Sequence, residues 1–467
     1  MQMLHRDRGH QAKIRAVSLD RIHAFRRRLQ QRSAERIVPT ESGLAYLADS
    51  IPDVYDHNYL SVEDVRVSAA DLAREADHAL SGRHHRRVIA EQGAPGLQAE
   101  FAELRYSLST HLVLEHRQAP DRLVDTSTVH EARLEELMPA RREAILREPW
   151  GGDEIAGQLN EAKRHVAAAV PTTFFAARAG GGIAGWCEVR TWDGTAQIED
   201  VEVLEEHRGR GLGRAIVQHA LEQARRTSSV VFLEALAEDW PRELYAKLGF
   251  VTVGRRDVYS RLPHPLTRLR LRTPRLELRL PTLDEVRALY LVAEEGIHDP
   301  GTMPFGIAWT DDLDAERFVA HHVDALARST PDDWVLNLVA FHEGRPIGSQ
   351  ALRAERFRTA KTVDSGSWLG SRYQGRGLGT EMRSAVLTLA FDHLGAERAT
   401  SGAIDRNPQS LGVSGKLGYV EVGSHLVSPR GRPVEHVDLE IDRARFTPAV
   451  ETEVGGLETV LPFLGLA

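Results

Sequence analysis

HRGRGLG at 207–213 and YQGRGLG at 373–379 are two glycine-rich segments of nearly the same sequence. Each follows an apolar, strand-like segment and precedes apolar residues at helical spacing. A strand that stops at small residues and restarts as a helix leaves several backbone N–H groups unpaired, and the helix dipole adds partial positive charge at the same place. A turn of this kind can hold a diphosphate. The sequence therefore predicts two anion-binding turns.

The surroundings of the turns repeat in the same order, which indicates a duplicated domain rather than a short-period solenoid. The turns lie 166 residues apart, the separation of Gly211 from Gly377. In the second copy, Thr282 and Glu285 form a capping box that predicts a helix start. The matching segments are strand hairpins at 173–189 and 336–352, strands at 230–233 and 398–403, and the endings KLGF at 247–250 and KLGY at 416–419.

Prolines at 263, 265, 274 and 281 predict a break between the copies, because proline cannot lie inside a helix or a central strand. The first 118 residues contain helix-like and strand-like patterns but no glycine-rich turn, and we interpret them as a ligand-free lobe. The predicted domains are the lobe at 1–118, a first domain at 119–262, a linker at 263–275, a second domain at 276–445 and a tail at 446–467.

Composition limits the class of protein. The 467 residues are 42% apolar and 27% charged, with a formal net charge of −8, which is typical of a folded soluble protein without a basic surplus for nucleic acid. The single cysteine, Cys187, excludes an intramolecular disulfide, and its alternating surroundings favour a buried position over a nucleophilic role. We expect a cytoplasmic protein with no secretion signal, no membrane span and no metal, either a monomer or a homodimer.

Both copies resemble the GNAT superfamily of N-acetyltransferases, whose motif is Arg or Gln, two residues, Gly, one residue, then Gly or Ala. Arg208, Gly211 and Gly213 match this motif, as do Gln374, Gly377 and Gly379. The second copy is similar to the ribosomal-protein N-acetyltransferase branch through LRTPRLELR (271–279), GTEM (379–382) and NPQSLGVSGKLGY (407–419). The tandem plan resembles that of the mycothiol synthases, and the lobe resembles a degenerate copy of the same fold.

The resemblance implies an α/β (α+β) class, with tandem GNAT-type folds in which a mixed twisted sheet is flanked by helices. It also implies acetyl-CoA as co-substrate, with its pyrophosphate on the turn, its pantetheine beside the preceding strand, and an amine as acceptor, either a small molecule or a protein N-terminus. The residues expected to bind acetyl-CoA are Val201, Val203, Arg208, Gly209, Arg210, Gly211, Leu212, Gly213 and Arg214 in the first copy, and Leu369, Gln374, Gly375, Arg376, Gly377, Leu378, Gly379, Thr380 and Asn407 in the second.

An amine with an ordinary pKa near 10 must lose a proton before it attacks a thioester, so a carboxylate near the reacting atoms is expected. Glu199, Asp200 and Glu202 lie on the strand before the first turn, and simple alternation places Glu199 on the opposite face from the other two. We prefer Glu199 as the base, with Glu202 as a further candidate. These carboxylates could equally be exposed strand residues that attract a cationic substrate.

The departing thiolate needs an acid. Tyr245, four residues before Gly249, matches the tyrosine that has this role in many family members, although a core aromatic is the alternative. At the equivalent place the second copy has Ser414. There the resemblance implies CoA contacts for Asn407 and Ser410, a catalytic position for Asp364 and assistance to the thiolate from Ser410, whereas the aromatic expected at Ser367 is missing.

The sequence is compatible with two functions and disfavours two others. The first is an acetyl-CoA-dependent N-acetyltransferase, and the second is an acyl-CoA sensor or scaffold with one or both units inactive. An ATP-binding protein is disfavoured because neither turn contains GKS or GKT. A dinucleotide-binding fold is disfavoured because each turn follows a hairpin rather than opening its unit.

Overall fold

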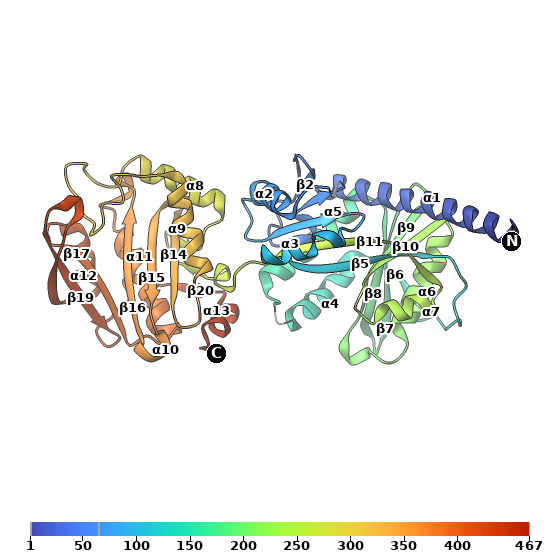
Figure 1. Cartoon of the computed structure of the whole chain (residues 1–467). Helices are drawn as coiled ribbons and strands as arrows, with labels where there is room; N and C mark the ends of the chain where they lie inside the picture. Colours follow the sequence, from blue (N-terminus) through green and yellow to red (C-terminus); the bar gives the residue numbers. More distant parts are fainter. Residues whose placement is uncertain (1, 64–65, 149, 467) are drawn as a thin grey trace. The chain divides into compact units, whose positions relative to one another are not determined.

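The computed structural model describes residues 2–63, 66–148 and 150–466. The chain divides into two compact units, residues 1–262 and 263–467, and each unit contains its own mixed sheet (Figure 1). This confirms the predicted α/β class with GNAT-type folds in two regions. In the described residues no helix is long and apolar enough to cross a membrane.

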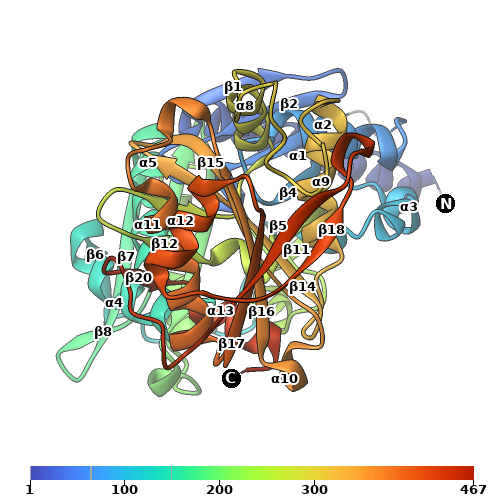
Figure 2. The same cartoon turned by 90° about the vertical axis from the view of Figure 1, so that its left-hand side faces the viewer.

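The second unit contains the simpler sheet, with the strand order β18-β19-β17-β16-β15-β14-β13-β12-β20. Helices α11 and α12 pack on one face, and α8 and α9 contribute apolar side chains to the other (Figure 2). The capping box is confirmed, because Thr282 accepts from the backbone of Glu285 and the Glu285 carboxylate accepts from the backbone of Thr282. The strands are β12 (Arg270–Arg272), β13 (Glu277–Arg279), β14 (Trp334–His342), β15 (Arg345–Ala354), β16 (Thr362–Leu369), β17 (Arg398–Ile404), β18 (Val420–Val427), β19 (Val434–Asp442) and β20 (Glu453–Gly455); the main helices are α8 (Leu283–Glu294), α9 (Ala315–Ala327), α11 (Leu378–Thr388), α12 (Pro408–Leu417) and α13 (Leu457–Leu464).

The first unit contains an eleven-stranded sheet in the order β1-β2-β3-β4-β11-β5-β10-β9-β8-β7-β6. Its strands are β1 (Arg36–Pro39), β2 (Gly43–Leu47), β3 (Tyr59–Val62), β4 (Arg86–Ala90), β5 (Ser107–His116), β6 (Val129–Ala132), β7 (Thr172–Ala179), β8 (Gly182–Trp192), β9 (Thr195–Val203), β10 (Val230–Leu236) and β11 (Phe250–Arg261). Its helices are α1 (Gln2–Ser33), α2 (Ala69–Ala79), α3 (Gln98–Glu103), α4 (Leu134–Arg147), α5 (Asp153–Ala169), α6 (Leu212–Arg225) and α7 (Pro241–Lys247).

The two sheets differ in the origin of one strand. In the second unit the last core strand, β19, lies between β17 and β18. In the first unit the equivalent place, between β10 and β11, is filled by β5, which comes from the N-terminal 118 residues. The N-terminal segment therefore completes the sheet that carries the first glycine-rich turn.

The N-terminal segment repeats the topology of the domain that follows it. β3 and β4 are parallel with α2 between them, just as β9 and β10 are parallel with α6 between them. Each repeat ends in a long strand, β5 or β11, and the two long strands pair antiparallel in the middle of the sheet. The final strands are exchanged between the two repeats, because β5 pairs with β10 and β11 pairs with β4.

The segments expected to be a linker and a tail are part of the second unit. β12 pairs with both β13 and β20, so residues 263–275 and 446–467 meet in the same sheet. Leu266, Leu269 and Leu271 are fully buried in its core. The prolines do interrupt regular structure, but the leucines between them supply enough apolar surface to fold the segment onto the domain.

Candidate functional site

Both glycine-rich turns have the backbone that an anion site requires. Gly209 and Gly211 have φ values of 74° and 82°, and Gly375 and Gly377 have 72° and 79°. These values are rare for residues with a Cβ atom. Gly211 and Gly377 precede α6 and α11 directly, and no side chain caps either helix. The N–H groups of the first helical turn are therefore free of side-chain acceptors.

The N-terminal repeat lacks this arrangement. Ser68 caps α2 by accepting a hydrogen bond from the N–H of Asp71, and the Asp71 carboxylate lies in the first turn of the helix. An acidic side chain at this position repels an anion.

Arg208 and Gln374 play the same part in the two turns. The Nε of Arg208 donates to the carbonyl of Val203 at 2.9 Å, and the Nε2 of Gln374 donates to the carbonyl of Leu369 at 2.8 Å. Both side chains therefore tie the turn to the last residue of the strand before it. This explains why the motif accepts either Arg or Gln, since both side chains have an N–H donor that can reach this carbonyl.

The predicted rim arginines have different surroundings. Arg210 and Arg376 are exposed beside their turns. Arg214 is buried, and its Nη1 donates to Asp121 at 2.6 Å, so it points away from the rim. The other predicted residues lie in the strand ends and helix starts that flank the turns: Val201, Val203, Leu212, Gly213, Leu369, Leu378, Gly379 and Thr380.

Arg275 is a cation beside the second turn that our sequence analysis missed. Its Nη1 donates to the carbonyl of Arg376 at 3.0 Å, and its Nε donates to Glu381 at 2.7 Å. The hydroxyl of Thr273 also donates to Glu381, at 2.6 Å. The buried Glu381 therefore fixes the start of the unit against α11, which gives a physical reason for the LRTPRLELR and GTEM motifs.

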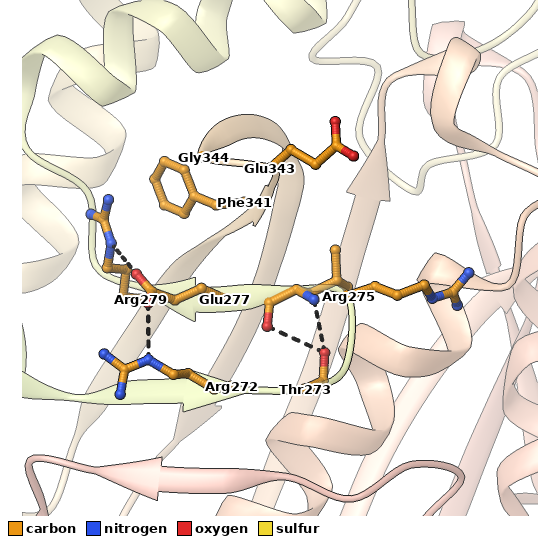
Figure 3. A pocket seen from close by; sticks show the side chains of 9 residues that line it. Arg272, Thr273, Arg275, Glu277, Arg279, Phe341, Glu343 and Gly344 are labelled. Atoms are coloured by element: carbon orange, nitrogen blue, oxygen red, sulfur yellow. Dashed lines mark hydrogen bonds and ion pairs between the residues drawn. The ribbon is translucent and has the colours of Figure 1, made fainter.

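Arg275 also lines an open pocket formed by the first strands of the second unit (Figure 3). The pocket's other arginines are engaged, because Arg272 and Arg279 both pair with Glu277. The pocket is therefore a polar surface whose charges are largely neutralised within the protein. We assign it no part in the reaction.

The central parallel strands separate in both units. β9 pairs with β10 from Thr195 to Gln197, although β9 continues to Val203. β16 pairs with β17 from Thr362 to Asp364, although β16 continues to Leu369. The separated part of each sheet leads directly into the glycine-rich turn. In this part the backbone groups that face the gap are not paired with the other central strand.

A β-bulge in β9 changes the expected arrangement of the carboxylates. Glu199 pairs with Glu188 and Glu202 pairs with Trp186, with a register shift between them. Directly paired residues lie on the same face of a sheet, so Glu199 and Glu202 share one face. The prediction that they lie on opposite faces is wrong, because the bulge inserts one extra residue. Asp200, at φ 57°, lies in the bulge.

The three carboxylates differ in their partners. Asp200 pairs with Arg141 and accepts from the indole N–H of Trp186 at 3.1 Å. Glu202 lies 3.1 Å from the Nη2 of Arg208. Both negative charges are therefore compensated by an arginine, whereas Glu199 accepts a hydrogen bond from the neutral amide of Gln197 at 2.7 Å.

The environment of Glu199 suits a general base. Burial raises the pKa of Glu199 to about 7; Glu234 and Glu188 add to this effect, while Arg190 and Lys163 oppose it. A base whose pKa lies near neutrality is available to take a proton and still basic enough to do so. Perturbed carboxyls of this kind are concentrated in active sites, although structural charge networks also contain them.

Tyr245 lies on the other side of the sheet from Glu199. It is buried in the α6-side core with Cys187 and Ile198, and its ring contacts Phe250. Burial first, and then the charge of Glu199, raise the pKa of Tyr245 well above its usual range. The phenol is therefore protonated at neutral pH, as an acid must be. Cys187 is fully buried, and burial raises the pKa of its thiol, which favours its structural role.

The predicted groups of the second unit are arranged differently. Asp364 pairs with Arg353, and Arg353 is also its partner across β15 and β16. Glu199 pairs with the residue three positions after the partner of the last residue of β9. The residue of β16 at the equivalent pair is Gly366. Asn407 caps α12 by accepting from the N–H of Ser410 at 3.1 Å. Asp364 and Ser410 therefore belong to separate elements, and the structure provides no close equivalent of Glu199.

One group in the described residues has the composition of a metal site. His425, His436 and Asp438 lie on the β18–β19 hairpin with their ligand atoms within 4.8 Å of one another. His425 lies 3.1 Å from Asp438, so the group is also a histidine–carboxylate pair. The sequence spacing gave no signal for it, because the pairing across the hairpin brings the residues together.

Comparison with known proteins agrees with this geometry. A model described as the acetyltransferase (GNAT) domain matches residues 275–420, and one described as the acetyltransferase (GNAT) family matches residues 139–250. These matches define the class of protein, an acyltransferase. The chain belongs to the GNAT acetyltransferases and contains two of their domains in tandem.

Among characterised proteins, the chain is similar to streptothricin acetyltransferase of Streptomyces lavendulae, with 37% identity over 86 residues. That segment is 18% of this chain and 46% of the relative, so the chain spans about half the length of that protein. One similar solved structure is RimJ of Mycobacterium smegmatis in complex with CoA-disulfide, with 16% identity over 42% of this chain and 95% of that chain and a TM-score of 0.34. Another is described as a ribosomal-protein-serine acetyltransferase from Vibrio cholerae, with 20% identity over 37% of this chain and 97% of that chain and a TM-score of 0.31.

Proposed function

We propose that the first unit transfers an acetyl group from acetyl-CoA to a primary amine by direct attack. What supports this proposal is the position of Glu199 and Tyr245 on opposite faces of the sheet near the point where β9 and β10 separate. Burial raises the pKa of Glu199 to about 7 and keeps the Tyr245 phenol protonated. The turn before α6 supplies the uncapped N–H groups for the pyrophosphate. The acceptor is a small-molecule amine or a protein N-terminus.

The reaction follows from these positions. Glu199 takes a proton from the bound ammonium, and the free amine nitrogen attacks the thioester carbonyl carbon. An N–C bond forms, the C–S bond breaks, and sulfur takes the bonding electron pair. The nitrogen loses its second proton to solvent as the amide forms. Tyr245 gives its proton to the sulfur and regains one from solvent, while Glu199 releases the proton that it took. Glu202 lies on the same face as Glu199 but is paired with Arg208, and it takes no proton in this reaction.

Replacing Tyr245 by phenylalanine should slow turnover with little change in the affinity for acetyl-CoA. The ring keeps its packing, and only the proton donor to sulfur is lost. General acid catalysis typically contributes about 10²–10⁴-fold, so we expect kcat to fall by at least about tenfold at constant KM for acetyl-CoA. An unchanged kcat would identify Tyr245 as a core aromatic.

Release of free thiol from acetyl-CoA across a panel of amines tests the proposal directly. Small polyamines, aminoglycoside-like amines and peptides with free N-termini cover the acceptor classes. Thiol release that depends on the amine supports the enzyme. Binding of CoA without release for any amine would support the alternative function, an acyl-CoA sensor or scaffold.

A further inference from the structure

Arg383 is a buried positive charge in the second unit. It lies on α11 with 3% of its surface exposed. Its Nη1 donates to the hydroxyls of Ser401 at 2.9 Å and Ser414 at 3.3 Å, and its Nη2 donates to Ser367 at 3.0 Å. Its Nε has no hydrogen-bond partner. Within the described residues, no carboxylate forms an ion pair with this guanidinium.

The groups around Arg383 do not neutralise it. β16, β17 and α12 contribute the three serine hydroxyls, and the nearby phenol of Tyr419 lies 3.2 Å from Ser365. Asp364 interacts electrostatically with Arg383, but its carboxylate oxygens contact Arg353 and Thr400 instead. Arginine keeps its proton in proteins, so the charge persists. An unpaired buried charge is strongly destabilising, which favours an anion that arrives with a ligand.

Arg383 contacts both β16 and β17 near the point where these two strands separate. Pairing of β16 with β17 ends at Asp364 and Thr400. Ser367 and Ser401, which accept from Arg383, lie just beyond that point on the two strands. The guanidinium therefore lies where a thioester would enter between the strands.

Comparison of the two units shows a reciprocal exchange of side chains. Counted from the turn glycine, Arg383 corresponds to Val217; counted from the final KLG, Ser414 corresponds to Tyr245. Val217 and Tyr245 share one core cluster, and Arg383 donates to Ser414. The first unit thus combines a small residue on the helix with a phenol, and the second combines a guanidinium on the helix with a small residue.

We propose that Arg383 is a catalytic residue of the second unit and stabilises the CoA thiolate, the part that Tyr245 plays in the first. This inference rests on the proposed function. When the amine nitrogen bonds to the carbonyl carbon, the C–S bond breaks and sulfur keeps its electron pair beside the guanidinium. The amine's proton goes to solvent. Arg383 gives up no proton, so CoA remains a thiolate until it leaves the site.

The test measures the ionisation of bound coenzyme A. The full chain carrying Gly211→Glu leaves one turn able to bind, and the ultraviolet absorbance of the thiolate is followed against pH. We expect the thiol of bound CoA to have a pKa at least about one unit below that of free CoA, which is tenfold more thiolate. Arg383→Met should return it to the free value, whereas Arg398→Met, which removes an exposed arginine of β17, should not.

A thiol pKa that is unchanged by Arg383→Met would overturn the role of Arg383. If the Gly211→Glu chain binds no CoA in calorimetry, the second unit has no CoA site, and the proposed role of Arg383 is ruled out as well. If Arg383→Met does not fold, Arg383→Val with Ser414→Tyr copies the pair of the first unit. That variant should release thiol from acetyl-CoA while its bound CoA ionises as in free solution, and a low pKa there would contradict the inference.

Discussion

Glu199→Gln should lower kcat/KM of the first unit by about 10²–10⁴-fold, the usual contribution of a positioned general base. The amide keeps the size of the side chain and can still accept from Gln197. It cannot take a proton from the ammonium. In the unmodified protein kcat/KM should rise with pH through about 7, because Glu199 must be ionised to act and its pKa is about 7. The variant should lose this limb of the pH profile.

Glu202→Gln is the matched control, since it removes a carboxylate on the same face that is paired with Arg208. We expect a loss below about tenfold, because this carboxylate is paired with Arg208 and takes no proton from the substrate. If Glu199→Gln kept the rate and the pH limb, or if both variants lost activity equally, Glu199 would be an electrostatic residue rather than the base.

Stability provides an independent check on Glu199. Its pKa in the folded protein is raised to about 7 from about 4.5, so the folded state binds this proton more tightly than the unfolded chain does. The carboxyl therefore costs no stability at pH 4, becomes increasingly destabilising as the pH rises from about 4.5 to about 7, and stays so above pH 7. Glu199→Gln should leave Tm unchanged at pH 4 and raise it at pH 8. A lower Tm at pH 8 would contradict the raised pKa.

Gly211→Glu and Gly377→Glu should each abolish CoA binding at one unit. The new side chain would extend from the position where the pyrophosphate approaches, and its charge would repel the diphosphate. A loss of at least about a hundredfold in affinity at one site is expected, measured by calorimetry. Gly211→Glu should also remove the turnover that depends on Glu199.

The matched controls are Gly211→Ala and Gly377→Ala. They impose the same unfavourable φ of about 80° but add only a methyl group, which at Gly211 meets no atom within 4 Å. Their affinity should fall much less than that of the glutamates. If a glutamate variant retained full binding at both units, that turn would not be the site.

Patterns that depend on local sequence were predicted well. The turns, the hairpins before them and the capping box at Thr282 follow from glycine, alternation and a polar residue at a helix start, and the structure contains all of them. Cys187 was correctly expected to be buried, because it lies in an apolar alternating strand.

Features that depend on contacts between distant residues were not predictable. The bulge in β9 leaves no signature in IEDVEV (198–203), yet it places Glu199 and Glu202 on one face. β5 is read as an ordinary strand, and only the sheet order shows that it completes the neighbouring repeat. Arg383 looks like a surface residue of an amphipathic helix until Ser367, Ser401 and Ser414 are found around it.

We propose that one chain contains two acyl-CoA sites, one at each glycine-rich turn. Counting bound acetyl-CoA per chain by native mass spectrometry, with calorimetry on the same sample, tests it most directly. The claim predicts two molecules per chain, falling to one in either glutamate variant. A count of zero, or a single molecule that persists in both variants, would contradict it.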